Sequence, residues 1–147
     1  MMNVLVIHGP NLNMLGHRNS AFYGNGTYED LKQLITDHAS KHDIHVEFFQ
    51  SNHEGDIIDR IQKAYFEDPD GMIINAGAYS HYSYAIRDAL EICSFPKIEV
   101  HISDVTDRES FRKNLVLSEV CDRTIYGKGF EGYEEALDFI LDMKHII

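Results

Sequence analysis

The residues of this chain best suited to chemistry are a tyrosine, an arginine, a histidine and a glutamate. His101 can carry a proton near neutral pH, and Glu99, two residues before it on an expected strand, points to the same face and can orient its ring. Tyr23 is a less usual base, because free tyrosine ionises only at about pH 10. Arg18, on the same loop, supplies a cation that favours the phenolate. These four residues predict general acid–base chemistry, with Tyr23 as the base and His101 as the acid.

Each of these residues, taken singly, also has a structural interpretation. A histidine where a strand ends, such as His101, is often only a hydrogen-bonded structural residue, and a lone Tyr23 is more often a packing residue. The catalytic interpretation requires Tyr23 and Arg18 to face His101 across one cavity. It fails if the three groups lie too far apart to contact one small substrate.

Other kinds of catalytic site have no matching motif in the sequence. There is no GxSxG elbow, and Cys93 and Cys121 lie in no motif that activates a thiol, so we expect both to be buried structural residues. The absence of a P-loop motif argues against a P-loop nucleotide enzyme. The nine histidines include no HExxH pair, so we predict no metal site and expect His38, His42 and His145 to be solvated helix residues.

Residues 127–132, GKGFEG, match the GxGxxG pattern of dinucleotide-binding turns. In such enzymes the turn comes early, and an acidic residue closes the next strand about 20 residues later. This chain has nearly ended at Gly132, so glycines that permit a tight strand-to-helix connection explain the pattern better. A flavodoxin-like small-molecule or nucleotide binding protein without turnover stays as the alternative function, and bound flavin would favour it.

Strand-like and helix-like segments alternate along the chain. Apolar runs predict strands at residues 4–7, 46–49, 72–74, 97–102 and 124–126, and apolar positions at helical spacing predict helices at about 28–42, 56–68, 82–93 and 133–143. Thr27 is a suitable N-cap for the first helix, with Glu29 and Asp30 in its first turn. Short right-handed crossovers then give an α/β fold, a flavodoxin-like three-layer sandwich with a five-stranded parallel sheet.

The loops that leave the carboxyl ends of these strands are expected to meet along one edge of the sheet, where open α/β proteins bind ligands. The longest of them spans residues 8–24, and its asparagines, arginine and tyrosine are unusual for a simple spacer or a disordered surface loop. The polar side chains expected at this edge are those of Asn11, Arg18, Tyr23, His53, Asn75, His81, His101 and Ser103.

Composition limits the size and the partners of the protein. Hydrophobic residues make up 44% and charged residues 25% of the chain, which fits one domain over residues 1–147. The net charge of -11 argues against nucleic acid as a partner, although it allows a small anionic substrate. No apolar run approaches the roughly 18 residues of a membrane span, and no basic-then-apolar leader precedes Val4. We therefore expect no membrane contact and a cytoplasmic location.

Six segments of the chain resemble, in the same order, those of the type II 3-dehydroquinate dehydratases, the type II dehydroquinases of the shikimate pathway. They are IHGPNLNMLGHR at residues 7–18 followed by Tyr23, QSNHEG at 50–55, INAGAYSHYSYAIRDAL at 74–90, IEVHIS at 98–103, RESFR at 108–112 and GFEGYEEAL at 129–137. The similarity covers nearly the whole chain, and the motifs together are highly specific. It implies a flavodoxin-like subunit, with no metal or organic cofactor, that converts 3-dehydroquinate to 3-dehydroshikimate by an anti elimination through an enolate.

The resemblance implies a role for each residue of the predicted site. Tyr23 would take the C2 proton, His101 would protonate the departing C1 hydroxyl, and Arg18 would favour the tyrosinate from a mobile lid. Asn11 would help to hold a water molecule against the enolate oxygen, and Glu99 would orient His101. Substrate contacts would come from Asn75, His81, Arg108, Arg112 and the backbone amides of Ile102 and Ser103.

The resemblance also implies a homo-oligomer, a dodecamer built from trimers, in which Asp88 reaches into the site of a neighbouring subunit. Many family members have proline after the lid arginine, where this chain has Asn19, and Asn and His where it has Asp104 and Thr106. We therefore expect a more mobile lid and a changed substrate affinity. Asp104 is expected either to weaken binding or to pair with an arginine such as Arg108.

Overall fold

Five strands form one parallel sheet in the computed structural model, which describes residues 1–145. They are β1 Met2–His8, β2 Ile44–Gln50, β3 Gly71–Asn75, β4 Lys97–Val100 and β5 Arg123–Ile125, in the order β2-β1-β3-β4-β5. This is the flavodoxin-like strand order, and the predicted fold class is confirmed. Residues 146 and 147, which we predicted to belong to the same domain, lie outside the described residues.

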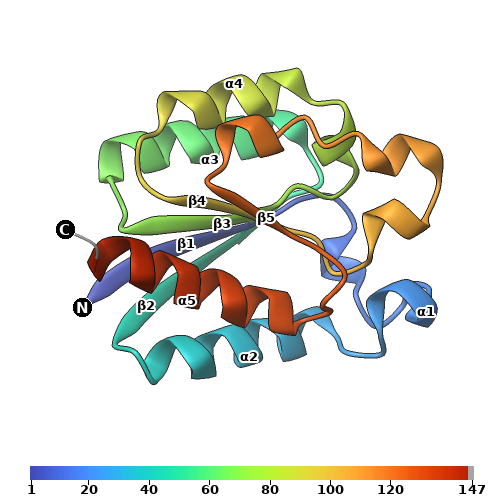
Figure 1. Cartoon of the computed structure of the whole chain (residues 1–147), viewed down its shortest axis with the longest axis horizontal. Helices are drawn as coiled ribbons and strands as arrows, with labels where there is room; N and C mark the ends of the chain where they lie inside the picture. Colours follow the sequence, from blue (N-terminus) through green and yellow to red (C-terminus); the bar gives the residue numbers. More distant parts are fainter. Residues whose placement is uncertain (146–147) are drawn as a thin grey trace.

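Helices cover both faces of the sheet (Figure 1). α2 (Tyr28–Ser40) and α5 (Glu131–His145) lie on one face, and α3 (Glu54–Glu67) and α4 (Tyr84–Ile92) lie on the other. The short helix α1 (Ser20–Tyr23) lies beyond the end of the sheet, at the right in Figure 1. Short 3-10 turns occupy Leu12–Met14, Gly77–His81, Val105–Asp107, Ser110–Lys113 and Ser118–Val120.

The sequence of β1 explains why both faces are covered. Successive side chains of a strand point to opposite faces, so Val4 and Val6 enter the core beneath α2 and α5, while Leu5 and Ile7 enter the core beneath α3 and α4. All four side chains are at most 2% exposed. A strand that is apolar on both faces requires a helical layer on each side, and this gives three layers.

The structure agrees with the predicted start of α2 and shifts other boundaries by a few residues. The side chain of Thr27 accepts a hydrogen bond from the backbone of Asp30, and the Asp30 carboxylate accepts one from the backbone of Thr27, which closes the first turn. α4 starts at residue 84 rather than 82, because the Ser83 side chain caps it. β4 ends at Val100, so His101 lies in the loop after the strand rather than within it.

The two cysteines are free thiols. Cys93 is buried beneath α3 and α4, as predicted, whereas Cys121 is only half-buried. Burial raises the pKa of Cys93 above its ordinary value and raises the pKa of Cys121 to about 12. Neither thiol is therefore activated as a nucleophile.

The ends of β1 and β3 are in close contact at the carboxyl edge of the sheet. Gly9 donates its backbone N–H to the carbonyl of Asn75 at 2.8 Å, and a Cβ on Gly9 would lie 2.3 Å from the carbonyl oxygen of Ala76. Only glycine fits this approach, which brings the loops after the two strands together. None of the helices in residues 1–145 has the length and apolar character of a membrane span.

Candidate active site

A cavity of about 100 Å³ lies at the carboxyl edge of the sheet, between the loops that follow β1, β3 and β4. Glu99 lies directly behind His101 and is fully buried. Asp88 on α4 and His53 before α3 are exposed and do not line this cavity. The predicted site residues that line it are Asn11, Arg18, Tyr23, Asn75, His81, His101, Ile102, Ser103, Arg108 and Arg112.

The phenol of Tyr23 lies between two guanidinium groups. Arg18 donates from Nη2 to the Tyr23 hydroxyl at 2.8 Å, and Arg108 donates from Nη1 to the same oxygen at 2.6 Å. Arg18 also lies over the Tyr23 ring, with its Cζ 3.8 Å from the ring centroid. Asn19 caps α1, because its side chain accepts a hydrogen bond from the backbone of Ala21, and this cap helps to position the tyrosine.

Two guanidinium charges therefore meet at one phenol oxygen. The pKa of Arg18 is lowered, mainly because the side chain is partly buried and also because Arg108 and Arg112 carry like charges. The phenol of Tyr23 acts in the opposite direction. An anion between the arginines relieves their mutual repulsion. The sequence predicted Arg18 as the partner of Tyr23, but Arg108, which is 85 residues from Tyr23, was expected only as a substrate contact.

A buried carboxylate holds His101. Oε2 of Glu99 accepts a hydrogen bond from His101 Nε2 at 2.6 Å, while Oε1 accepts from the hydroxyls of Ser118 and Thr124 at 2.7 and 3.1 Å. Burial alone would raise the pKa of Glu99, but the hydrogen bond and charge of His101, helped by the two hydroxyls, hold it below its ordinary value. Glu99 is therefore an anion at neutral pH. It occupies Nε2 of His101 and leaves Nδ1 as the nitrogen for proton transfer.

His81 packs against His101, with ring centroids 6.2 Å apart and an angle of 23° between the ring planes. Nδ1 of His81 lies 3.0 Å from the carbonyl oxygen of Asn114, which can only accept, so Nδ1 carries the proton. Burial lowers the pKa of His81, and the hydrogen bond to Asn114 partly opposes this effect. The ring is then neutral near pH 7, and its Nε2 can accept a hydrogen bond from a substrate hydroxyl.

A buried hydrogen-bond network that the sequence analysis missed fixes the amide of Asn75. Its Nδ2 donates to the Tyr133 hydroxyl at 3.1 Å, and its Oδ1 accepts from the backbone of Gly77 at 3.1 Å. The Tyr133 hydroxyl lies 3.0 Å from Nε2 of His8, whose Nδ1 lies 3.0 Å from the Tyr28 hydroxyl. Burial lowers the pKa of His8 to about 3 and raises that of Tyr28 to about 12, so both are neutral near pH 7. The only feature of the sequence that pointed to this network was His8, a histidine at the end of an apolar strand.

Asn11 and Arg112 line the cavity and have partners of their own. Asn11 has a left-handed backbone conformation with φ of 70°, which asparagine tolerates better than most residues, and its N–H donates to the Asn52 side chain at 3.0 Å. Arg112 donates from Nε to Glu109 at 2.6 Å. The substrate contact predicted for Arg112 must therefore come from its terminal nitrogens or replace this ion pair.

The expected pairing of Asp104 with an arginine such as Arg108 is wrong. The Asp104 carboxylate instead accepts a hydrogen bond from the backbone of Thr106 at 3.0 Å and a second from the Thr106 hydroxyl. Arg108 is directed to Tyr23 and to the Ser103 hydroxyl, at 2.6 and 3.1 Å. Asp104 forms these local hydrogen bonds rather than an ion pair with Arg108, because an aspartate side chain readily accepts from the backbone N–H two residues ahead.

A larger hollow of about 600 Å³ lies beside the cavity and shares Tyr23, Ile102 and Ser103 with it. Neither His101 nor Glu99 lines this hollow. A reaction there would lack the histidine acid, so we assign the candidate active site to the smaller cavity.

The glycines of residues 127–132 form a tight connection between β5 and α5. Gly127 and Gly129 have φ of 78° and 60°, and their backbone N–H groups donate to the carbonyls of Ser103 and Ile102. Because these donors are occupied, the turn does not offer them to a phosphate group. This geometry supports the structural interpretation of the GxGxxG pattern.

A parallel sheet with titratable side chains lining a cavity at its carboxyl edge is the arrangement of an α/β enzyme. The family profile described as dehydroquinase class II matches residues 2–141 of this chain. The chain therefore belongs to the class II dehydroquinase family, and the resemblance drawn from its motifs is confirmed.

Relatives of known function are similar over nearly the full length. The 3-dehydroquinate dehydratase of Thermotoga petrophila is 56% identical over 139 residues, which is 95% of this chain and 94% of that protein. The 3-dehydroquinate dehydratase of Lachnoclostridium phytofermentans is 54% identical over 143 residues, which is 97% of this chain and 99% of that protein. The crystal structure of type II dehydroquinase from Butyrivibrio crossotus superposes with a TM-score of 0.93 at 53% identity, covering 95% of this chain and 97% of that one.

Proposed function

We propose that this chain dehydrates 3-dehydroquinate to 3-dehydroshikimate, the reaction of its family in the shikimate pathway. One observation carries the proposal: a phenol held by two guanidinium groups and an imidazole held by a buried carboxylate line the same cavity. A base and an acid on one small cavity are the two groups that an elimination of water needs.

In the proposed mechanism, the Tyr23 phenolate removes a proton from C2 of the substrate, next to the C3 ketone. The electron pair left on C2 moves to the ketone oxygen and forms an enolate. The enolate then expels the C1 hydroxyl, which takes a proton from His101 and leaves as water, and the C1–C2 double bond forms. Tyr23 has gained one proton and His101 has lost one, so exchange with solvent restores both groups.

The other residues of the cavity bind or stabilise in this proposal. Arg18 and Arg108 stabilise the phenolate, and Glu99 keeps His101 in position for its proton transfer. Asn11 holds a water molecule against the enolate oxygen. The substrate carboxylate binds the backbone amides of Ile102 and Ser103, and its hydroxyls bind Asn75, His81 and Arg112.

The test is turnover of 3-dehydroquinate, followed by the absorbance of the conjugated enone product. Tyr23→Phe and His101→Ala should each lower kcat by about 10²-fold to 10⁴-fold, because each removes one proton-transfer group. Tyr126→Phe is a matched control, since this tyrosine is 40% exposed and does not line the cavity. Wild-type turnover by Tyr23→Phe would refute the assigned base, and no turnover by the wild-type protein would refute the function.

We further propose that identical chains assemble as trimers grouped into a dodecamer, and that Asp88 completes the site of a neighbouring subunit. Asp88 is exposed on α4 and lies outside the cavity of its own chain. Ala89, the residue after Asp88, lines a groove together with the exposed side chains of Tyr65, Phe66 and Ile92. Such an apolar surface suits contact with another copy.

Light scattering should find a dodecamer, and Phe66→Glu should give a smaller and less active species. A fully active monomer would contradict the proposal.

Two further expectations belong to the proposed function. The family resemblance implies catalysis without a metal or organic cofactor, so protein dialysed against a chelator should keep its turnover. The cytoplasmic location stays a prediction, which cell fractionation would check.

A further inference from the structure

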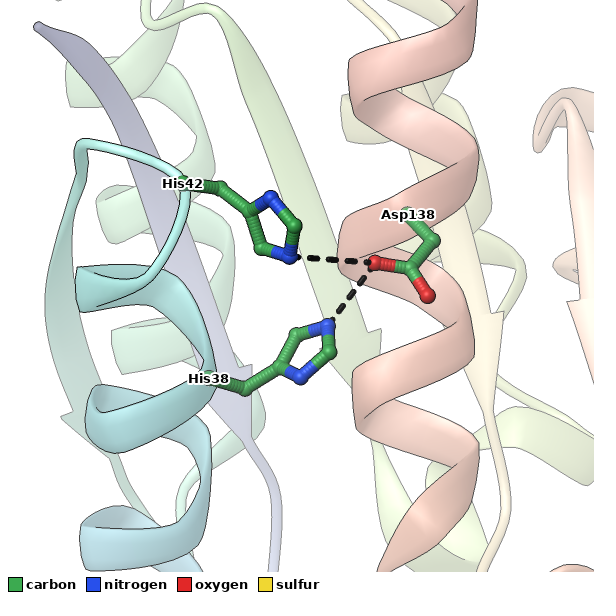
Figure 2. Close-up of side chains that lie close together, drawn as sticks. All are labelled: His38, His42 and Asp138. Atoms are coloured by element: carbon green, nitrogen blue, oxygen red, sulfur yellow. Dashed lines mark hydrogen bonds and ion pairs between the residues drawn. The ribbon is translucent and has the colours of Figure 1, made fainter.

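Three side chains, His38, His42 and Asp138, meet at the surface, away from the candidate active site (Figure 2), and Glu134 contacts His38. His38 lies in the last turn of α2, and His42 follows one residue after its C-cap. Asp138 and Glu134 lie on α5, four residues apart on one face. We expected both histidines to be solvated helix residues, which is wrong for His38, because its side chain is only 15% exposed and contacts both carboxylates.

Both imidazole rings direct Nε2 at one carboxylate oxygen (Figure 2). Nε2 of His38 lies 2.8 Å from Oδ1 of Asp138, and Nε2 of His42 lies 4.0 Å from the same atom. One donor atom from each of the three residues lies within 4.8 Å of the others. Two nitrogens and one oxygen thus converge on a small volume that is open to solvent on the side of His42 and Asp138, which are 41% and 53% exposed.

These separations match the geometry of a tetrahedral metal ion. Ligand atoms about 2.1 Å from such an ion lie about 3.4 Å from one another. The two separations from Oδ1 of Asp138, 2.8 and 4.0 Å, lie on either side of that value, and all three donor atoms lie within 4.8 Å of one another. Movements of about an ångström by the exposed side chains of His42 and Asp138 would therefore bring the donors into place, with water as the fourth ligand.

Glu134 supplies the outer support that a metal-binding histidine requires. Oε2 of Glu134 lies 3.2 Å from Nδ1 of His38, the ring nitrogen that faces away from Asp138. A carboxylate on the second nitrogen fixes the ring orientation and tautomer and makes the first nitrogen a better ligand. The turn that follows α2 brings the ring of His42 beside that of His38, with the ring centroids 5.1 Å apart.

We propose that His38, His42 and Asp138 bind one divalent transition-metal ion of the zinc class, with Glu134 positioning His38. Imidazole nitrogens suit Zn²⁺, Ni²⁺, Co²⁺ and Cu²⁺, whereas Mg²⁺ and Ca²⁺ prefer all-oxygen sites. The sequence did not predict this site, because its carboxylate comes 100 residues after the first histidine and forms no metal-binding motif with it. The proposal stands independently of the proposed enzymatic function.

The bound ion would tie the end of α2 to the middle of α5. α2 starts beside the loop that leaves β1 and ends just before β2, so its last turn lies at the amino edge of the sheet, opposite the candidate active site. A metal that binds the folded chain and not the unfolded one raises stability by mass action. The ion therefore stabilises the packing of α2 on α5 and leaves turnover unchanged.

The experiment uses the full-length protein after removal of metals with a chelator. Zn²⁺ is titrated by calorimetry, and the unfolding temperature is measured with and without Zn²⁺, with Mg²⁺ as the control cation. We expect one Zn²⁺ per chain and, at about a hundred times the dissociation constant, an unfolding temperature raised by roughly 9 °C. Mg²⁺ at the same concentration should have no effect.

Three variants locate the ion. His42→Ala and Asp138→Asn should abolish the saturable Zn²⁺ binding and the thermal shift, and Glu134→Gln should weaken binding by about 10-fold to 100-fold. His45→Ala, which changes an exposed histidine outside the cluster, should bind Zn²⁺ as the wild-type protein does. The proposal is overturned if the wild-type protein shows no saturable Zn²⁺ binding, which would leave only a surface ion-pair network. It is overturned equally if His42→Ala and Asp138→Asn bind Zn²⁺ unchanged.

Discussion

Replacement of Glu99 by glutamine separates the charge of the carboxylate from its hydrogen bonds. Glu99 is fully buried, and its two oxygens contact His101, Ser118 and Thr124. In Glu99→Gln, the amide oxygen can still accept from His101, and the amide nitrogen can donate to the two hydroxyls, which accept as well as donate. The variant should therefore fold, with a neutral group beside the imidazole.

The magnitude of this change follows from the distance between the groups. Two unit charges about 4 Å apart interact by about 4 kcal/mol at an effective dielectric constant of about 20. His101 Nε2 lies 2.6 Å from the Glu99 oxygen, so the pair is within that range. Because the glutamine still accepts a hydrogen bond, we expect about half of this energy to be lost, about 2 kcal/mol, which lowers kcat about 30-fold.

The assay is steady-state turnover of 3-dehydroquinate. Glu99→Gln should lower kcat with little change in KM, because the imidazole that transfers the proton loses the charge that supports it. Ser118→Ala is the matched control, since it removes one hydrogen bond to Glu99 and leaves the charge in place. A Glu99→Gln variant with the kcat of the wild-type protein would show that the carboxylate charge does not support proton transfer.

Three further predictions concern the supports of the site and the core. Tyr133→Phe removes the hydroxyl that accepts from Asn75, so KM should rise about 10-fold with little change in kcat; an unchanged KM would mean that the network does not position the amide. Burial lowers the pKa of His8 from 6.5 to about 3, so between these two pH values the unfolded chain binds a proton that the folded chain does not. The free energy of unfolding therefore decreases as the pH is lowered from 6.5 towards 3. The free energy of unfolding in urea should be about 2 kcal/mol lower at pH 5 than at pH 7 from this group, and His8→Gln should lose that part of the slope. Gly9→Ala places a Cβ 2.3 Å from a backbone oxygen and should cost about 3 kcal/mol or more, whereas Gly55→Ala, with no atom within 4 Å, should be tolerated; equal stability of the two would refute the packing argument.

The sequence predicted the sheet because buried parallel strands leave a simple pattern. β3, with residues 71–75 all buried, appears in the sequence as an uninterrupted apolar run that ends in a polar residue. The position of the site followed from topology, since loops at the carboxyl ends of neighbouring parallel strands must meet. Tyr23, Asn75 and His101 therefore line one cavity although they come from three separate segments of the chain.

The contacts that complete the site had no comparable pattern. Residues 104–113 are charged and irregular, so nothing in their spacing placed Arg108 on the hydroxyl of Tyr23. Ser118 and Thr124 were not predicted as partners of Glu99, because a hydroxyl in a short turn or a short strand can bond to many neighbours. Such choices depend on the packing of side chains from several segments, which periodicity does not encode.

The acid and the base of the candidate site are held by different kinds of support. His101 follows β4, donates its backbone N–H to Ile125 at 2.8 Å, and is held at its ring by the buried Glu99. Tyr23 lies on α1, a four-residue helix without a buried residue, and the hydrogen bonds of its hydroxyl come from Arg18 and Arg108. A helix this short is not stable by itself, so we expect the two arginines, together with packing of the ring against the core, to keep Tyr23 in place. In the proposed mechanism, the two arginines that contact the Tyr23 hydroxyl therefore both support the base and fix its position at the cavity.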